Sequence, residues 1–117
     1  VDRICAEADF ITLHTVLTDE TRNLINAKRL AAMKKTAVLI NTARGGLIDE
    51  AALLAALKAG SIYGAGLDVF EQEPPSDPAW YELDNLVMGS HCSSSTAGAT
   101  ETMGNMAVDN LLRDLGL

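Results

Sequence analysis

Residues 37–46 read Ala-Val-Leu-Ile-Asn-Thr-Ala-Arg-Gly-Gly, and this stretch decides the fold class. The apolar residues at its start follow one another without polar alternation, which predicts a strand with helices on both faces, as in a parallel sheet. Polar residues follow, and Gly45-Gly46 then interrupts the regular secondary structure. The stretch therefore predicts a buried parallel strand over residues 37–41, whose exit carries Arg44.

The sequence on either side alternates further strands with helices. Asn26 and Asp49 are favourable N-cap residues, and Gly60 is a favourable helix end. This alternation is typical of a doubly wound α/β fold with right-handed crossovers, flanking helices and a long C-terminal helix. The predicted strands are 9–14, 37–41, 64–69 and 85–88, and the predicted helices are 27–33, 50–59 and 96–115.

The composition is that of a single acidic globular domain. The 117 residues carry a formal net charge of −7, and 48% of them are apolar. Nucleic acids and anionic membranes bind clustered Lys and Arg, so we expect neither as a partner. No export signal and no C-x-x-C spacing is visible, which favours a cytoplasmic location. We expect no metal site, because the cysteines and histidines are scattered as packed residues usually are: Cys5, His14, His91 and Cys92.

Ligands of doubly wound folds bind beyond the carboxyl ends of the strands. The strand exits gather one arginine, several carboxylates and two histidines at one edge of the predicted sheet. A guanidinium at Arg44 can bind a carboxylate through two parallel hydrogen bonds, and Gly45-Gly46 would let a ligand approach the backbone beside it. The alternative is that Arg44 is only a solvated loop charge.

His91 can exchange a proton near neutral pH, although a single histidine is often only a structural imidazole. A carboxylate beside it would stabilise the imidazolium and fix the ring, but spacing alone does not choose between Glu71 and Glu73. Asp68 ends an apolar strand, where it either caps a turn or binds a polar group of a ligand. Together with Arg44, these residues suit a small 2-oxo or 2-hydroxy acid.

Four segments, read in order, resemble the D-isomer-specific 2-hydroxyacid dehydrogenase family. Residues 8–22 resemble its fourth-strand segment, 33–50 its arginine signature, 66–74 its acidic signature and 90–96 its histidine segment. The resemblance covers the whole chain and implies the second half of a doubly wound, Rossmann-like NAD-binding domain. Residues 1–117 are then expected to form a partial domain, without a substrate domain and without the G-x-G-x-x-G loop that holds a pyrophosphate.

The resemblance also implies a role for each candidate residue. Arg44 anchors the carboxylate and carbonyl of the substrate, His91 is the acid–base residue, and Glu73 is its carboxylate partner. Asp68 bonds the carboxamide of the nicotinamide. The implied cofactor is NAD, with NADP as the alternative, and its further contacts are implied to be His14, Thr15, Thr42, Ala43, Arg44, His91, Ser93 and Ser94.

The implied reaction is hydride transfer between a nicotinamide and a small D-2-hydroxy acid or its 2-oxo acid. Two alternatives stay open: an NAD-sensing binding protein of the co-repressor kind, and a non-catalytic assembly module. We expect the 117-residue chain alone to be inactive. The resemblance implies a homodimer. Without the first strands of the domain, residues 9–14 would also present a bare edge that recruits another chain.

Overall fold

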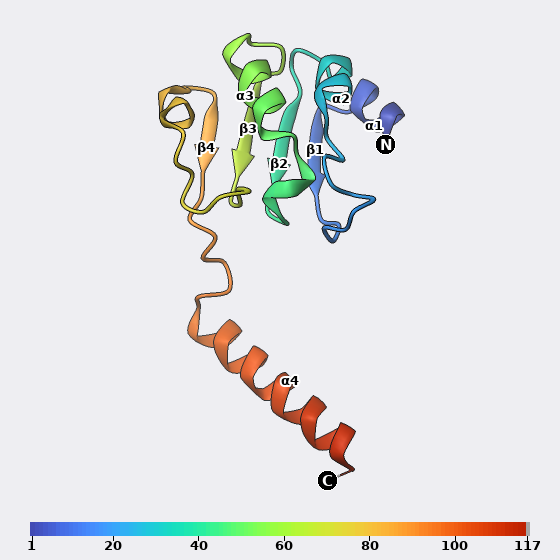
Figure 1. The fold of residues 1–117 in the computed structure, drawn as a ribbon, viewed down its shortest axis with the longest axis vertical. Coiled ribbons are helices and arrows are strands. Elements are labelled where there is room, and N and C mark those ends of the chain that lie inside the picture. The colour runs from blue at the N-terminus through green and yellow to red at the C-terminus, as the bar shows by residue number, and fades with distance from the viewer. Residues whose placement is uncertain (117) are drawn as a thin grey trace.

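The computed structural model describes residues 1–116 and contains a four-stranded parallel sheet, from which one long helix projects (Figure 1). The strands lie in the order β1-β2-β3-β4, and every neighbouring pair is parallel. This arrangement confirms the predicted α/β class. In chain order the elements, with η for a short 3-10 helix, are α1 (Asp2–Glu7), β1 (Phe10–Leu13), α2 (Ala27–Ala32), β2 (Val38–Asn41), η1 (Gly45–Leu47), α3 (Glu50–Lys58), β3 (Gly64–Leu67), η2 (Pro78–Glu82), β4 (Leu86–Met88) and α4 (Ala97–Leu115).

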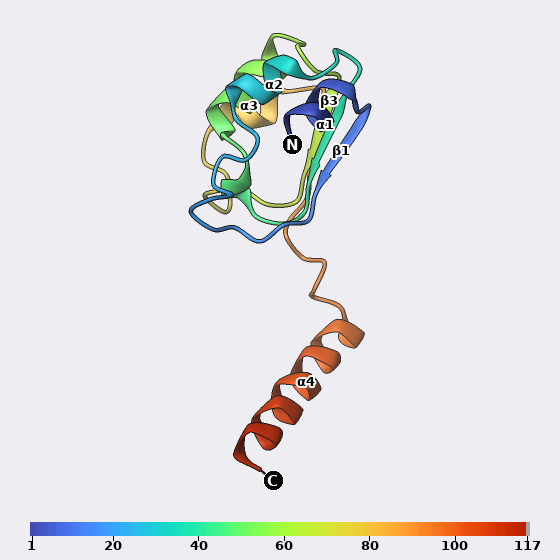
Figure 2. The ribbon, with the colours of Figure 1, turned by 90° about the vertical axis from the view of Figure 1, so that its right-hand side faces the viewer.

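Helices cover only one face of the sheet, whereas the apolar run at residues 37–41 predicted helices on both. Seen nearly edge-on, α2 and α3 lie on the same side of the strands (Figure 2). Ile11 and Leu39 are buried on that side, while Phe10 and Val87 on the other side each keep 74% of their surface exposed. The prediction is therefore wrong for the described residues. An apolar strand sequence indicates that both of its faces can be buried. It does not tell which helix, or which other part of the protein, packs on each face.

The predicted helix starts and ends are confirmed to within one or two residues. The side chains of Asn26 and Asp49 accept hydrogen bonds from first-turn backbone amides of α2 and α3, at 3.1 and 3.0 Å. Gly60 follows the end of α3 with φ of +61°, a conformation that glycine adopts without strain. These caps fix where α3 begins, and α3 begins directly beside the strand exits.

The core lies between the covered face of the sheet and the helices α2 and α3. Leu39 of β2, Leu53 of α3 and Leu47 of η1 are fully buried. Burying a side chain of this size contributes about 1.5–3 kcal/mol. Because η1 and α3 share this core with β2, the loops at the carboxyl edge of the sheet stand on packed elements.

Within residues 1–116, the outer strand β1 pairs only with β2. The edge expected at residues 9–14 is therefore exposed, and association of another chain along it stays a prediction.

Helix α4 projects away from the sheet in both ribbon views (Figures 1 and 2). It has the predicted helical spacing of apolar residues, and Met103, Met106 and Leu111 are each more than half exposed. None of the helices within residues 1–116 combines the length and hydrophobicity needed to cross a bilayer.

Candidate active site

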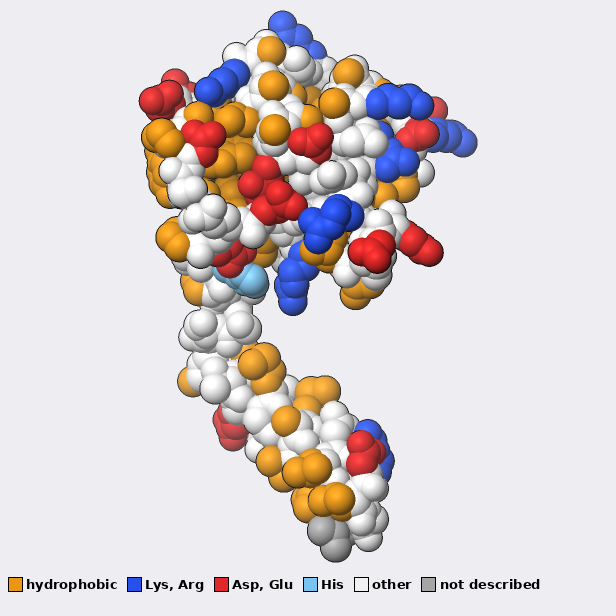
Figure 3. Space-filling model, in the orientation of Figure 1, with side chains coloured by type: hydrophobic (Ala, Val, Ile, Leu, Met, Phe, Trp, Pro, Cys, Tyr) orange, Lys and Arg blue, Asp and Glu red, His pale blue; other side chains and the backbone are white. Residues whose placement is uncertain are grey.

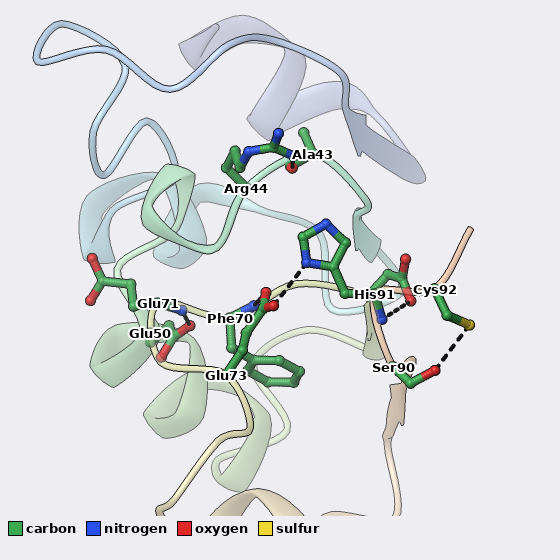
Figure 4. A network of polar contacts seen from close by, with 10 residues as sticks. Ala43, Arg44, Glu50, Phe70, Glu71, Glu73, Ser90, His91 and Cys92 are labelled. Atoms are coloured by element: carbon green, nitrogen blue, oxygen red, sulfur yellow. Dashed lines mark hydrogen bonds and ion pairs between the residues drawn. The ribbon is translucent and has the colours of Figure 1, made fainter. Parts of the chain in front are cut away.

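The carboxyl ends of the strands meet at one edge of the sheet. On the face shown in Figure 3, a histidine, basic side chains and acidic side chains gather at this edge. The close view in Figure 4 shows the His91 ring between Arg44 and Glu73. The predicted convergence of the strand exits is therefore present.

Glu73 pairs with His91. The Nδ1 atom of His91 lies 2.8 Å from Oε2 of Glu73, and the backbone amide of Phe70 donates to the other carboxylate oxygen at 3.0 Å (Figure 4). The hydrogen bond from His91 lowers the pKa of Glu73 most, and the Phe70 amide lowers it further. Both side chains are about 40% exposed. The geometry thus selects Glu73 over Glu71, which instead forms an ion pair with Arg22 at 3.0 Å.

The backbone of His91 is fixed by Asp68. Oδ1 of Asp68 accepts a hydrogen bond from the His91 amide at 3.0 Å, and His91 adopts a positive φ of +53°. Gly89 is required here because a Cβ at this position would lie 2.1 Å from the same carboxylate oxygen. Asp68 therefore caps the turn that presents His91, one of the two roles considered for it. A contact with the cofactor stays a prediction.

Arg44 stands on a loop that is tied to a buried side chain. Asn41 is fully buried, and its amide donates to the carbonyl of Arg44 at 2.9 Å and accepts from the amide of Ala43 at 3.1 Å. The Arg44 guanidinium is exposed and donates to the carbonyl of Ala43 at 2.6 Å. Asn41 was not among the predicted site residues. Its signal in the sequence is a polar residue at the end of an otherwise apolar strand.

Gly45 and Gly46 do not leave room for a ligand, contrary to the expectation. A Cβ at Gly45 would lie 2.0 Å from the carbonyl carbon of Phe70, and one at Gly46 would lie 3.0 Å from the side chain of Leu17. Both glycines are buried. They let the arginine loop pack closely against protein atoms, so this prediction is wrong.

Two cavities divide the predicted site residues. One, of about 470 Å³, is lined by Asp68, Glu73 and His91 together with apolar side chains. The other, of about 520 Å³, is lined by His14, Thr15, Thr42, Ala43 and Arg44, at the exits of β1 and β2. Ser93 and Ser94 line neither cavity and lie in the exposed segment before α4. No three His, Cys, Asp or Glu side chains within residues 1–116 are placed to hold a metal ion.

The residues present fit the nicotinamide end of a dinucleotide. The second cavity offers hydroxyl and backbone groups, and the Asp68 carboxylate in the first can accept from a carboxamide. The 117 residues contain no G-x-G-x-x-G loop for the pyrophosphate. The fit therefore extends to the nicotinamide and not to the phosphates.

Residues 1–93 match the sequence profile of the D-isomer specific 2-hydroxyacid dehydrogenase, NAD binding domain. The chain belongs to this family. Among its relatives are a D-3-phosphoglycerate dehydrogenase of Methanocaldococcus jannaschii, 46% identical over 98% of the chain, and a hydroxypyruvate reductase of Thermotoga maritima, 44% identical over 100%. The chain spans only 22% and 39% of the lengths of these two proteins.

Solved structures share the fold. A D-isomer specific 2-hydroxyacid dehydrogenase from Lactobacillus delbrueckii ssp. bulgaricus, in its NAD-complexed form, is 35% identical with a TM-score of 0.84 and matches 98% of this chain to 39% of its own. An acyclic imino acid reductase in complex with NADPH and D-Arg is 34% identical with a TM-score of 0.89 and matches 98% of this chain to 37% of its own. Relatives of this chain thus hold either dinucleotide.

Proposed function

We propose that the natural full-length protein transfers a hydride between a nicotinamide cofactor and a small D-2-hydroxy acid or the matching 2-oxo acid. The observation that carries this proposal is the 2.8 Å pairing of His91 with Glu73 at the same sheet edge as Arg44. A purely structural histidine has no need of a carboxylate that is itself oriented by a backbone amide. We also propose that residues 1–117 form part of the NAD-binding domain, because the glycine-rich loop is missing from them.

His91 is the acid–base residue of this proposal. An ionised carboxylate only accepts hydrogen bonds, so the pairing with Glu73 places a proton on Nδ1 of His91 and leaves the lone pair of Nε2 free. In the oxidation direction, Nε2 takes the proton of the substrate hydroxyl, and the charge of Glu73 stabilises the resulting imidazolium. In the reduction direction, Nε2 returns that proton to the carbonyl oxygen.

Arg44 orients the substrate. Its exposed guanidinium can hold the substrate carboxylate through two hydrogen bonds and polarise the neighbouring carbonyl. The residues that would hold the nicotinamide are Asp68 and the lining of the second cavity, including His14, Thr15, Thr42 and Ala43. When bound, the nicotinamide supplies or accepts the hydride. NAD is the proposed cofactor, with NADP as the alternative.

The test is His91→Asn in the natural full-length protein. Reduction of glyoxylate, hydroxypyruvate and other small 2-oxo acids is followed by consumption of NADH or NADPH. We expect turnover to fall by roughly 10²–10⁴-fold, the usual contribution of a positioned acid–base group, while the affinity for the reduced cofactor changes less than about twofold, because the ring is not its main anchor.

Two outcomes overturn the proposal. One is turnover by His91→Asn at the level of the unchanged protein. The other is cofactor binding by the unchanged protein with no turnover of any 2-oxo or 2-hydroxy acid, which would instead indicate an NAD-sensing protein.

A further inference from the structure

We propose that Glu50 is a positioning residue for the His91–Glu73 pair, acting through the peptide that joins Phe70 to Glu71. This inference rests on the proposed function, since it assigns a role in the same reaction. Glu50 was not among the residues singled out from the sequence, and its hydrogen bond is with the backbone of Glu71.

Glu50 holds the loop that carries Glu73. Its Oε1 atom accepts a hydrogen bond from the backbone amide of Glu71 at 2.6 Å. The preceding amide, that of Phe70, donates to the Glu73 carboxylate at 3.0 Å. Two successive amides of one loop thus point to two different carboxylates. If the Phe70–Glu71 peptide rotated, residues 71–73 would move and Glu73 would leave the position that binds His91.

The anchor itself is rigid. Glu50 is the first residue of α3, and the cap at Asp49 fixes the start of that helix. The same Phe70–Glu71 peptide is pressed against the backbone of Gly45, where no Cβ fits. The Phe70 ring packs edge-on against Trp80, with ring centroids 5.7 Å apart. Contacts from Glu50 of α3 and from Gly45 therefore converge on the Phe70–Glu71 peptide, and Trp80 of η2 packs against the side chain of Phe70.

Glu50 also adds negative charge behind the pair. The pKa of Glu50 is raised above its ordinary value, chiefly because the carboxyl is partly buried. The hydrogen bond from the Glu71 amide lowers this pKa, and the carboxylates of Glu71 and Glu73 raise it. Arg22 partly balances this cluster through its 3.0 Å ion pair with Glu71, and Asp77 lines the cavity beside Glu50. The charge of Glu50 therefore acts on the Glu73 carboxylate, which is the hydrogen-bond partner of His91.

Hydrogen bonding and charge can be separated by two substitutions. Glu50→Gln keeps an oxygen that can accept from the Glu71 amide but removes the charge. Glu50→Ala removes both. Glu82→Gln is the matched control, because Glu82 is exposed and lies at the end of η2, outside these contacts.

The experiment measures kcat, KM and the pH dependence of 2-oxo acid reduction in the natural full-length protein. We expect Glu50→Ala to lower kcat roughly tenfold through misplacement of Glu73, with KM for the acid changed less than about twofold. We expect Glu50→Gln to keep kcat within about threefold, while its activity falls off at a lower pH than in the unchanged protein. Glu82→Gln should match the unchanged protein in all three measurements.

A second readout does not depend on turnover. Nitrogen chemical shifts of the His91 ring, in protein labelled with ¹⁵N-histidine, report which ring nitrogen carries the proton. We expect the Nδ1-protonated form to persist in Glu50→Gln and to lose its preference in Glu50→Ala. An inactive unchanged protein would refute the proposed function, yet the ring shifts would still test the role of Glu50.

The inference is overturned if Glu50→Ala keeps the kcat and ring shifts of the unchanged protein. If Glu50→Ala fails to fold, Glu50→Gln provides the test. An unshifted pH profile in Glu50→Gln would show that the charge of Glu50 has no role. A loss of kcat in Glu50→Gln as large as that expected for Glu50→Ala would show that the hydrogen-bond acceptor has no role.

Discussion

Replacing Asn41 with leucine should damage both the stability of the fold and the placement of Arg44. The side chain of Asn41 is fully buried and makes two hydrogen bonds, to the carbonyl of Arg44 at 2.9 Å and from the amide of Ala43 at 3.1 Å. Leucine has a similar size and makes neither bond. Leaving a buried polar group unpaired costs about 1–3 kcal/mol, and these two backbone groups are only partly buried. We therefore expect a loss of about 2–3 kcal/mol in the free energy of unfolding.

Urea unfolding followed by circular dichroism measures this loss, with Asn105→Leu as the control. Asn105 lies on the exposed surface of α4, so the same substitution there should change stability by less than about 0.5 kcal/mol. Because Asn41→Leu frees the loop of Arg44, KM for the 2-oxo acid should also rise. If Asn41→Leu were as stable as the control, the two hydrogen bonds would not hold the loop that carries Arg44.

Three further substitutions test the rest of the site. Arg44→Lys keeps the positive charge but loses the paired donors, so kcat/KM for the acid should fall roughly 10–100-fold in steady-state kinetics. The affinity for NADH, measured by fluorescence titration, should be unchanged. A loss confined to NADH affinity would contradict the role of Arg44 in substrate binding. Gly45→Ala forces a Cβ to within 2.0 Å of the Phe70 backbone and should lower the free energy of unfolding in urea by about 1–3 kcal/mol. Gly104→Ala is the control: it has open space around it and should be neutral or stabilising. Equal stability of the Gly45→Ala and Gly104→Ala variants would contradict the close packing at Gly45. Glu73 has a lowered pKa because His91 and the Phe70 amide favour its ionised form, so its contribution is complete above the ordinary glutamate pKa of about 4.3 and is lost as the pH falls through the lower native value. Glu73→Gln should therefore unfold with a free energy lower by at most about 1 kcal/mol at neutral pH, since both partners are about 40% exposed. Urea unfolding should show this difference vanish in acid. A difference that grew in acid would contradict the lowered pKa of Glu73.

Local patterns in the sequence predicted the parts of the fold that depend on local physics. Asn26 and Asp49 cap helices because a short polar side chain can reach the first free amides, and this requires only neighbouring residues. The strands of a parallel sheet and their common carboxyl edge follow from the alternation of elements. Convergence of Arg44, His91 and one of the two carboxylates at Glu71 and Glu73 was therefore predictable without knowledge of their distances. The choice of Glu73 came from the family resemblance.

Contacts between distant segments could not be predicted in this way. The partner of Gly45 is the Phe70–Glu71 peptide, 25 residues further along the chain, and no periodicity links the two positions. Glu50 stood next to a predicted helix cap and looked like an ordinary first-turn acid. The exposed face of the sheet was missed for a different reason: Phe10 and Val87 have the side chains of covered positions, and the sequence shows their hydrophobicity without showing what packs on them.

The loops of the candidate site are held by contacts outside the His91–Glu73 pair. Gly45 meets the Phe70–Glu71 peptide, and Asp68 holds the amide of His91, so the three loops that carry the reactive groups are locked to one another. A half-exposed ion pair such as His91–Glu73 contributes too little to hold loops in place. The packing of Gly45 against the Phe70–Glu71 peptide involves no ionisable group, so this contact is unchanged when the pair changes its protonation during a reaction. Two further contacts do involve carboxylates, that of Asp68 with the His91 amide and that of Glu50 with the Glu71 amide. Substitutions at Glu50 should therefore change both the placement and the pH response of the site.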